Sequence, residues 1–327
     1  MDISNKNLIN IKDANITVIG LGRSGESAAR LGKKLGANIL ISDGSSDTGV
    51  IKHGEKLSTM GITVETGGHS EKIYDADLCV ISPGIAQDAT IVNEMKANGI
   101  PIVSEIEFAS WFTYGAIIAV TGSNGKTTSV NLLAEMCETK GFSPALAGNV
   151  GTAFSDIVIK DLETMPSDRV YVLEISSFQM EHIVHFKPFI SVFLNVTPDH
   201  LDRYSGMDAY IQAKMNMIQN QDQRDHIVYN YDDPVLNTKF DGVLPQTHGF
   251  SILGERETLF TMNATKIYDE EHATLIHLDK LALPGRHNLA NALAAATAAK
   301  ILGVPNSQIA QVMSTFIGVE HRLERVL

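Results

Sequence analysis

The sequence predicts an α/β fold in which two parallel-sheet domains follow one another along the chain. Short apolar runs alternate with helical patterns over most of the 327 residues, which is typical of strands joined by crossover helices. In each series, a glycine-rich turn and then a helical pattern follow the first strand. Between Leu259 and Leu281 the pattern changes to short alternating runs, which predicts a small antiparallel excursion.

The first series is predicted to form one domain over residues 1–113. Continuous Ile-, Val- and Leu-rich strands between helices indicate a sheet that is covered on both faces. The predicted strands are 16–20, 38–42, 77–82 and 100–103, and the predicted helices are 24–35 and 88–98.

The second series is predicted to form a domain over residues 114–317. The helix 288–302 is the clearest, because it is rich in alanine, the residue with the highest helix propensity. The predicted strands are 116–120, 170–174, 190–194 and 226–229, and the predicted helices are 126–140, 176–185, 207–219, 288–302 and 306–316.

Composition and charge exclude several classes of function. The formal net charge is −12, so we expect no nucleic-acid partner, which would need a basic face. No apolar run reaches the length of a membrane span, and the N-terminus lacks the apolar core of a signal peptide, so we expect a cytoplasmic protein. Cys79 and Cys137 are predicted to be core residues and not a redox or metal pair.

The strongest candidate site is Thr121-Gly-Ser-Asn-Gly-Lys-Thr-Thr128, directly after the apolar run 116–120. Such a turn can wrap backbone N–H groups around a polyphosphate at a helix N-terminus. Lys126 would then neutralise the terminal phosphates, and the Thr127 hydroxyl would bind Mg²⁺. The spacer between Gly122 and Gly125 is shorter than in the common P-loop, so a P-loop variant and an ordinary strand-to-helix turn both fit the pattern.

Two turns of the first domain are further candidates. Gly20-Leu-Gly-Arg-Ser-Gly25 has the spacing of a dinucleotide-binding turn, and Asp43 ends the next predicted strand, where an acidic residue would reach a ribose. Alone, they predict NAD binding, although the same turn can hold any diphosphate or be purely structural. Ser82-Pro-Gly84 ends another strand at the edge where open sheets bind ligands, and it also fits a plain turn.

The second domain offers three more candidates. Glu174 ends a predicted strand and is suited to bind Mg²⁺, although a lone glutamate there also fits a helix N-terminal charge. The segment Asn195-Val-Thr-Pro-Asp-His-Leu-Asp202 gathers polar side chains at one strand end, which indicates either a site or a polar turn. Lys214, taken by itself, is a solvated helix lysine.

Together, these segments resemble the Mur ligase family of peptidoglycan synthesis. The shortened loop looks like the family's own form, and the turns at 20–25 and 82–85 are most similar to members that add D-glutamate. Members that add L-alanine share much of the pattern, whereas folylpolyglutamate synthetases lack the first turn. The segments that carry the resemblance, in order along nearly the whole chain, are 121–127, 148–151, 173–179, 195–202, 213–214, 285–291 and 321–322.

The resemblance implies an ATP-dependent ligase that adds D-glutamate to UDP-N-acetylmuramoyl-L-alanine through an acyl phosphate. It implies a Rossmann-like N-terminal domain that holds UDP in place of NAD, a central P-loop ATPase-type domain, two Mg²⁺ ions and a monomer. Three alternatives stay open: an L-alanine ligase acting on UDP-N-acetylmuramate, a non-catalytic nucleotide-binding relative and, from the first turn alone, an NAD-dependent oxidoreductase.

The resemblance also implies roles for single residues. Lys126, His200 and Lys214 would be catalytic. The metal ligands would be Thr127, Glu174, His200 and Lys214, the last once carbamylated by CO₂. The ATP site would comprise Gly122, Ser123, Asn124, Gly125, Lys126, Thr127, Thr128, His287, Asn288, Asn291 and Arg322. The UDP substrate would contact Gly22, Arg23, Ser24, Asp43, Ser82, Pro83, Gly84, Asn149, Ser176, Gln179 and His200.

Family members carry a third, C-terminal domain that binds the incoming amino acid, and residues 318–327 would be its start. We therefore expect a chain that lacks this domain, binds the UDP substrate and has feeble or no ligase activity by itself. At Gly44-Ser45 the resembling enzymes vary, so no uracil contact is assigned beyond Asp43.

Overall fold

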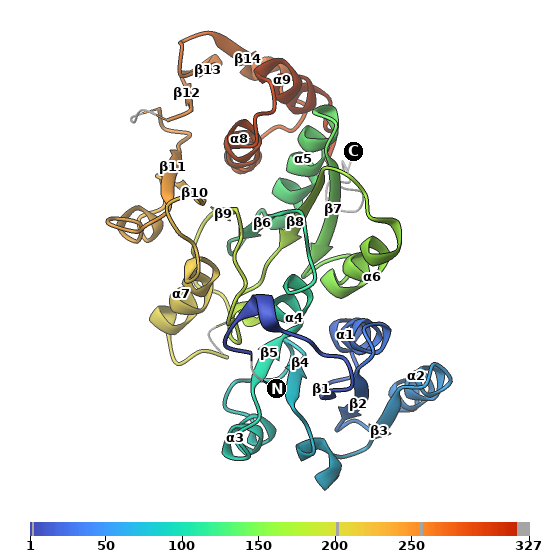
Figure 1. Cartoon of the computed structure of the whole chain (residues 1–327). Coiled ribbons are helices and arrows are strands. Elements are labelled where there is room, and N and C mark those ends of the chain that lie inside the picture. Colours follow the sequence, from blue (N-terminus) through green and yellow to red (C-terminus); the bar gives the residue numbers. More distant parts are fainter. Residues whose placement is uncertain (2, 201–202, 255–257, 319–327) are drawn as a thin grey trace. The chain divides into compact units, whose positions relative to one another are not determined.

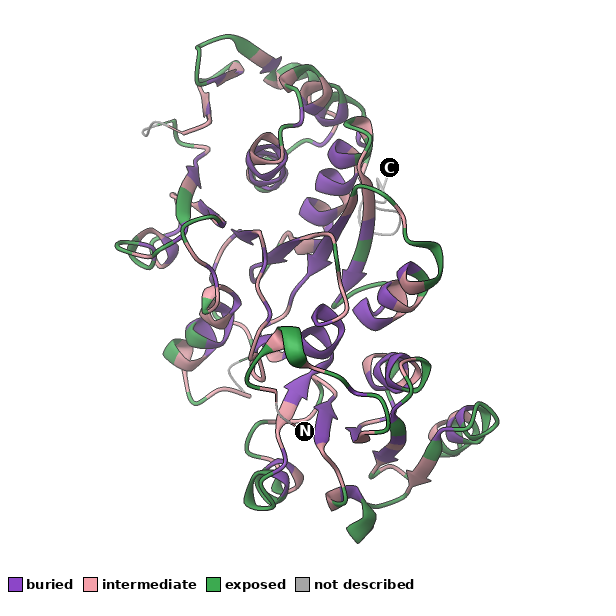
Figure 2. Ribbon diagram, in the orientation of Figure 1, coloured by how far each residue is buried: buried purple, intermediate pink, exposed green. Residues whose placement is uncertain are grey.

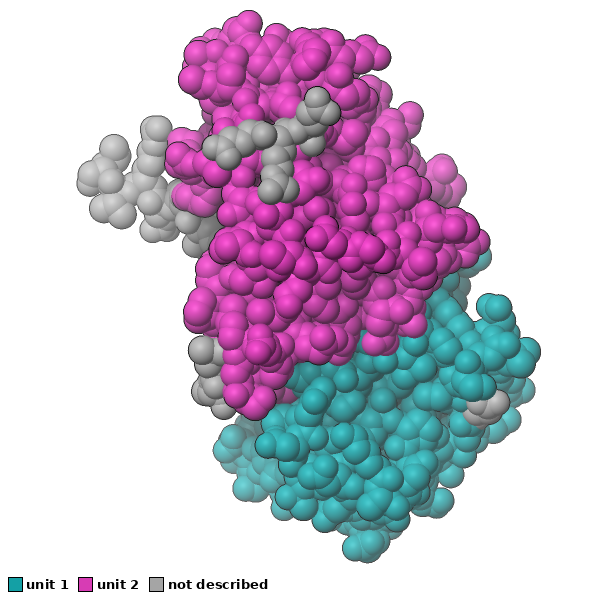
Figure 3. All heavy atoms as spheres, turned by 90° about the vertical axis from the view of Figure 1, so that its left-hand side faces the viewer, with its two compact units in different colours: residues 1–114, 151–165, 177–186 teal, residues 115–150, 166–176, 187–327 magenta. Residues whose placement is uncertain are grey.

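The computed structural model describes residues 1, 3–200, 203–254 and 258–318 (Figure 1). The chain forms two compact units, coloured separately in Figure 3. Unit 1 comprises Met1–Tyr114, Gly151–Met165 and Ser177–Phe186; unit 2 comprises Gly115–Val150, Pro166–Ser176 and the chain from Lys187 onward. Two segments that follow residue 114 in sequence thus belong to unit 1. The predicted domains, 1–113 and 114–317, divide the chain differently, and their bounds stay a prediction.

Unit 1 is built on a five-stranded parallel sheet with the order β3-β2-β1-β4-β5. Four strands confirm the predicted ones: β1 (Asn15–Ile19), β2 (Asn38–Asp43), β4 (Leu78–Ile81) and β5 (Ile102–Ser104). β3 (Thr63–Thr66) was not predicted, because none of its residues is fully buried and it has no apolar run. The central strands are buried, and Leu78, Cys79, Val80 and Ile81 are all inaccessible or nearly so.

The helices of unit 1 include two that the sequence predicted, α1 (Arg23–Lys34) and α3 (Thr90–Ala97). The others are α2 (Thr48–Ser58), α4 (Glu105–Ser110), α6 (Phe154–Thr164) and the 3₁₀ turns η1 (Lys6–Leu8), η2 (Glu71–Tyr74) and η3 (Phe178–Met180). The predicted helix 176–185 is wrong, because only η3 forms there. The β-branched pair Ile183-Val184 disfavours a helix, and the Phe186 and His185 amides bond to a side chain instead.

That side chain is Glu107 of α4, which is fully buried. Its carboxylate accepts hydrogen bonds from Trp111 Nε1 at 2.5 Å and from the backbone N–H groups of His185 and Phe186, each at 2.7 Å. A buried carboxylate is tolerated only when such donors replace water. Glu107 therefore fixes the 177–186 segment onto α4 within unit 1.

Unit 2 contains a six-stranded parallel sheet with the order β11-β10-β9-β6-β8-β7. The strands β6 (Ala116–Thr121), β8 (Arg169–Glu174), β9 (Ile190–Phe193) and β10 (His226–Asn230) confirm the prediction. β7 (Ser143–Gly148) and β11 (Gln246–Phe250) were not predicted, because both are edge strands with exposed residues and little apolar sequence.

The antiparallel excursion is confirmed. β12 (Phe260–Met262), β13 (Lys266–Asp269) and β14 (Thr274–His277) form a three-stranded antiparallel sheet. The short turns η5 (Leu236–Thr238) and η6 (Leu278–Lys280) lie before and after it in sequence.

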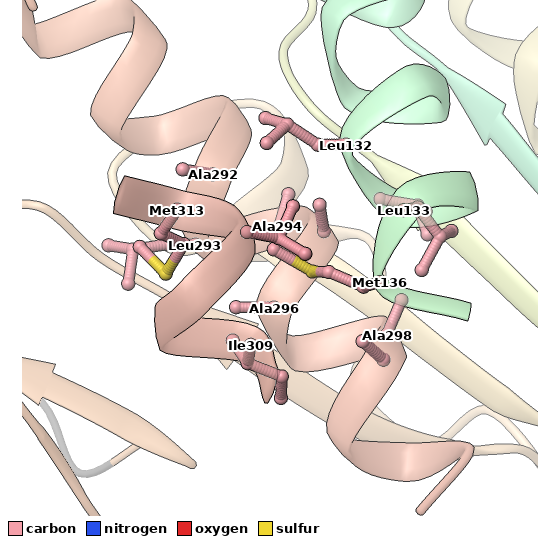
Figure 4. Packing of buried hydrophobic residues seen from close by; sticks show 14 of the residues in the cluster. Leu132, Leu133, Met136, Ala292, Leu293, Ala294, Ala296, Ala298, Ile309 and Met313 are labelled. Carbon is pink, nitrogen blue, oxygen red and sulfur yellow. The ribbon is translucent and has the colours of Figure 1, made fainter. Parts of the chain in front are cut away.

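The helices of unit 2 are α5 (Lys126–Thr139), α7 (Met207–Met215) with η4 (Asn216–Ile218), α8 (Arg286–Ile301) and α9 (Asn306–Thr315). α8 is buried along most of its length (Figure 2). Side chains of α5, α8 and α9 meet in one apolar cluster (Figure 4). The small alanines of α8 let α5 approach closely, and this packing fixes the helix that follows the glycine-rich loop.

Two expectations from composition can be compared with these elements. Cys79 and Cys137 are both buried and free, as predicted, and burial raises the pKa of each thiol to about 12. Within the described part of the chain, no helix has the length and apolar character needed to cross a membrane.

The core of unit 2 yields a first prediction. Leu293 of α8 is fully buried in the cluster, so Leu293→Ala should lower the free energy of unfolding by about 2–5 kcal/mol through lost burial and a cavity. Urea denaturation followed by circular dichroism measures this change. Leu244→Ala is the control, because Leu244 is 74% exposed and its truncation should cost about 0.5 kcal/mol or less. Equal effects of the two substitutions would contradict the packing described here.

Candidate functional site

The candidate site of unit 2 lies where the strand order of its sheet reverses. From β6 the chain crosses to β7 and β8 on one side, and then returns to β9 on the other side of β6. In open parallel sheets, ligands bind at the carboxyl ends of strands at such a point. The loop 122–125 follows β6 and the segment beginning at Asn195 follows β9, so the fold brings both sequence candidates to one edge.

The loop 122–125 is closely fitted to its surroundings. Gly125 caps α5 with φ +87°, and a Cβ on it would lie 2.2 Å from Asn291 Oδ1 of α8. Asn195 holds the other side: its Oδ1 accepts from the Asn124 N–H at 2.8 Å and its Nδ2 donates to Asn124 O at 3.0 Å. Asn195 was only part of a polar cluster in the sequence, and no role was assigned to it by itself.

Lys126 folds back over the loop. Its Nζ donates to the carbonyl oxygens of Gly122 at 2.7 Å and Ser123 at 3.1 Å. The ammonium group therefore lies above the turn where a phosphate would be bound. Thr128 lies in the first turn of α5, and both Thr128 and the loop residue Asn124 line the pocket described below.

Thr127 and Glu174 form a buried polar pair. Thr127 Oγ1 donates to Glu174 Oε2 at 2.7 Å, and Asn149 Nδ2 donates to Glu174 Oε1 at 3.1 Å. Thr127 is 8% exposed and Glu174 is 3% exposed. The structure thus brings together three predicted residues from α5, the end of β8 and the residue after β7. Hydroxyl and carboxylate oxygens are the ligands that Mg²⁺ takes.

Lys214 of α7 is not the solvated lysine that its local pattern indicates. It is 3% exposed, its Nζ lies 4.5 Å from the centroid of the Tyr210 ring and donates to Gly122 O at 3.4 Å. Burial lowers the pKa of Lys214 to about 7, helped by the neighbouring charge of Lys126 and opposed by Asp199. The fold therefore disfavours the charged form of this amine beside the loop.

His200 adopts a left-handed backbone conformation, with φ +53°. Its side chain is exposed, and Nε2 lies 3.5 Å from Asp199 Oδ2. No group of three or more His, Cys, Asp and Glu side chains suited to hold a metal ion occurs among the described residues. The metal-binding roles of His200 and Lys214 stay predictions.

A pocket of about 600 Å³ opens next to the loop. Its walls combine aliphatic side chains with amides, which suits a flat, polar ring such as a purine base. It brings together the predicted Asn124, Gly125, Thr128, His287, Asn288 and Asn291. Sequence analysis assigned no site role to its other walls, Leu194, Asn195, Asn230, Ile252, Leu283, Arg286, Ala290 and Gly318. Of these, Asn195, Arg286 and Ala290 lie in segments that carry the resemblance, and Asn230 directly follows a predicted apolar strand.

The predicted UDP-contacting residues of unit 1 gather at the carboxyl edge of its sheet. Gly22 caps α1, Arg23 and Ser24 form its first turn, Asp43 ends β2, and Ser82, Pro83 and Gly84 follow β4. Gly20 has φ +96°, and a Cβ on Gly25 would lie 1.9 Å from Gly20 O. Both glycines are therefore required for the close approach of α1 to β1.

Asp43 has a structural role at this edge. Its Oδ2 accepts from the Leu21 N–H at 2.6 Å and its Oδ1 from the Ser45 N–H at 2.8 Å. The carboxylate thus fastens the glycine turn to the end of β2. A second pocket of about 260 Å³ lies beside it, lined by Ile19, Gly20, Asp43, Gly44, Ser45, His69, Ile85 and Ile91.

Three predicted residues lie elsewhere. Ser176 follows β8 in unit 2, whereas Gln179 belongs to unit 1 and is 3% exposed. Arg322 lies outside the described residues. Their predicted roles are not tested by the geometry.

Comparison with known families gives two matches. Residues 120–299 match the Mur ligase middle domain, and residues 14–104 match the MurD-like N-terminal domain of Mur ligases. Among curated proteins, the chain is 40% identical to UDP-N-acetylmuramoylalanine–D-glutamate ligase of Salinibacter ruber, over 97% of this chain and 70% of the relative. It is 38% identical to the protein of that name from Bacteroides fragilis, over 95% of this chain and 70% of the relative.

Solved structures show the same fold. The UDP-N-acetylmuramate:L-alanyl-γ-D-glutamyl-meso-diaminopimelate ligase of Neisseria meningitides matches with a TM-score of 0.64 at 21% identity, covering 94% of this chain and 99% of that one. The murein peptide ligase of Psychrobacter arcticus matches with a TM-score of 0.61 at 20% identity, covering 95% and 70%. The family matches and the identity to curated relatives, covered over 70% of their length, agree: this chain belongs to the Mur ligase family.

Proposed function

We propose that this chain carries the nucleotide-binding part of an ATP-dependent ligase that adds D-glutamate to UDP-N-acetylmuramoyl-L-alanine. The chain spans 70% of the length of its first curated relatives, which bear the name of that activity. The observation that carries the proposal is the edge of unit 2, where the glycine-rich loop, the Thr127–Glu174 pair and the amide-lined pocket meet.

The chemistry of this edge suits phosphoryl transfer to a carboxylate. Two anions, the substrate carboxylate and the triphosphate, must approach each other, which requires concentrated positive charge in a site that excludes water. The loop N–H groups and Lys126 would bind the phosphates once Lys126 leaves the carbonyl oxygens it now contacts. The carboxylate then becomes an acyl phosphate, which the incoming amino group attacks with loss of phosphate.

Thr127 and Glu174 fit a Mg²⁺ ion, because a hydroxyl and a carboxylate oxygen already lie 2.7 Å apart at the end of the loop. When bound, the ion would neutralise the negative charge of the phosphates. The chain's own contribution is to hold these oxygens in place: Asn149 donates to the second oxygen of Glu174, which leaves the carboxylate one fixed orientation.

Lys214 is proposed to be carbamylated. Its neutral Nζ can attack CO₂, so that a N–C bond forms, one C=O electron pair moves to oxygen, and the nitrogen loses a proton. The product is an anion in place of a cation. Beside Lys126 this change is favourable, because the two like charges become a pair of opposite charges. The carbamate would be suited to support a second Mg²⁺ ion.

The UDP moiety is proposed to bind unit 1, at the edge formed by the glycine turn, Asp43 and Ser82–Gly84. Calorimetric titration of the chain with UDP-N-acetylmuramoyl-L-alanine, UDP-N-acetylmuramate and NAD tests this proposal. We expect the alanyl compound to bind most tightly. Preference for UDP-N-acetylmuramate would favour an L-alanine ligase, and binding of NAD alone would overturn the proposed function.

The substitution Lys126→Ala should weaken ATP binding and leave binding of the UDP compound unchanged. Lys126→Ala deletes the charged donor of the loop, and loss of such a bond costs about 1.5–3 kcal/mol, so ATP affinity measured by calorimetry should fall at least tenfold. The affinity for the UDP compound should stay unchanged, because its UDP moiety is proposed to bind unit 1, at the glycine turn, Asp43 and Ser82–Gly84. Lys140→Ala, at the exposed end of the same helix, is the matched control. Loss of both affinities would contradict the assignment.

Carbamylation can be observed directly. After addition of ¹³C-bicarbonate, the chain should show a carbamate carbon signal that is absent from Lys214→Ala. The signal should grow as the pH rises through about 7, since the amine is neutral only above its pKa. Lys126→Ala should move this rise to higher pH, because the lysine charge that lowers the pKa is gone. Lys187→Ala is the control, since ion pairs with Asp222 and Asp225 raise the pKa of Lys187. A signal that survives in Lys214→Ala would contradict the proposal.

A further inference from the structure

A chain of hydrogen bonds leads to His69, one of the walls of the small pocket of unit 1. The hydroxyl of Ser42, which is fully buried in β2, lies 2.6 Å from Glu65 Oε1 and 2.7 Å from His69 Nδ1. Glu65 also accepts from the Ser70 N–H at 3.1 Å and from Ser70 Oγ at 2.7 Å. Neither Glu65 nor His69 was a candidate in the sequence, because nothing in their pattern distinguishes them from surface residues.

The number of protons on Glu65, Ser42 and His69 determines which atom is the donor in each of these hydrogen bonds. Glu65 accepts from three donors; although burial opposes it, the hydrogen bonds from Ser42 and Ser70 lower the pKa of Glu65, so it is a carboxylate without a proton to donate. Ser42 has one hydroxyl proton and must give it to Glu65. The Ser42 oxygen can then only accept from His69, so the proton of a neutral His69 is on Nδ1.

The other ring nitrogen, Nε2, is therefore a hydrogen-bond acceptor. It has no partner among the described residues, and it lies 3.5 Å from the position that a Cβ on Gly44 would occupy. Gly44 and His69 line the same pocket of about 260 Å³. The remaining walls are Ile19, Gly20, Asp43, Ser45, Ile85 and Ile91, and the three isoleucines offer apolar contact to a flat ring.

We propose that His69 selects the base of the bound nucleotide: Ser42 and Glu65 hold it as the Nδ1–H tautomer, and Nε2 accepts a hydrogen bond from a pyrimidine that carries a ring N–H, as uracil does. This inference rests on the proposed function, because it concerns the nucleotide half of that substrate. Cytosine presents an acceptor at the same ring position and would leave two acceptors facing each other.

The test is calorimetric titration of the chain with UDP, CDP and 3-methyl-UDP, which lacks the ring N–H. Wild-type protein should bind UDP about tenfold more tightly than either analogue. Each analogue lacks the ring N–H, so it loses one hydrogen bond and leaves Nε2 of His69 unpaired. His69→Leu should lose this preference by weakening UDP binding alone. Ser42→Ala, which keeps the imidazole but releases its tautomer, should reduce the preference as well.

His53→Leu is the matched control, because His53 is a half-exposed histidine of unit 1 that pairs with Glu26 and does not line the pocket. It should keep the wild-type preference. Two-bond ¹⁵N–¹H correlation spectra of the neutral imidazole give a readout that needs no nucleotide. In the wild type, His69 should carry its proton on Nδ1. In Ser42→Ala, the proton should exchange between Nδ1 and Nε2.

The outcomes separate the two hypotheses. If no uridine nucleotide binds the wild-type chain, the proposed function fails and this inference fails with it. If UDP binds but His69→Leu binds UDP and CDP as the wild type does, the inference alone is overturned. An Nε2–H tautomer in the wild type would also overturn it.

Discussion

The candidate site of unit 2 depends on one buried carboxylate, Glu174. Its side chain joins α5 through Thr127 and the end of β7 through Asn149, and its backbone oxygen accepts from the Asn149 N–H at 2.8 Å. A Cβ on Gly148 would lie 2.2 Å from that oxygen. A charge so far from water is tolerated only when its oxygens are hydrogen-bonded, and this requirement fixes the helix, the loop and two strand ends together.

This arrangement means that the edge is largely prepared before a ligand binds. Asn195 holds the loop from one side and Asn291 from the other, and the helix core beneath α5 prevents it from shifting. Lys126 donates to two loop carbonyl oxygens. A loop that is already held in place lowers the entropy lost on binding.

The two glycine-rich turns of the chain lie beside acidic residues with opposite roles. Glu174 turns its carboxylate toward a hydroxyl that can share a metal ion with it, whereas Asp43 uses both oxygens to close a turn. A further carboxylate, Glu65, acts at a distance from the pocket by fixing a proton on its neighbours. In each case the hydrogen-bond partners, and not the residue type, decide what the acid does.

The sequence by itself determined the fold class, the central strands, the glycine-rich loop and the family, because apolar periodicity and motif order are local properties of the chain. It missed β3, β7 and β11, whose half-exposed residues carry no apolar run, and it predicted a helix at 176–185 where Glu107 holds the backbone instead. Only the tertiary structure decided that Lys214 is buried, that Asp43 closes a turn, and that Asn195, Asn230 and His69 line pockets. Those properties arise from contacts between residues far apart in sequence, since burial and hydrogen-bond partners exist only after the strands have taken their order.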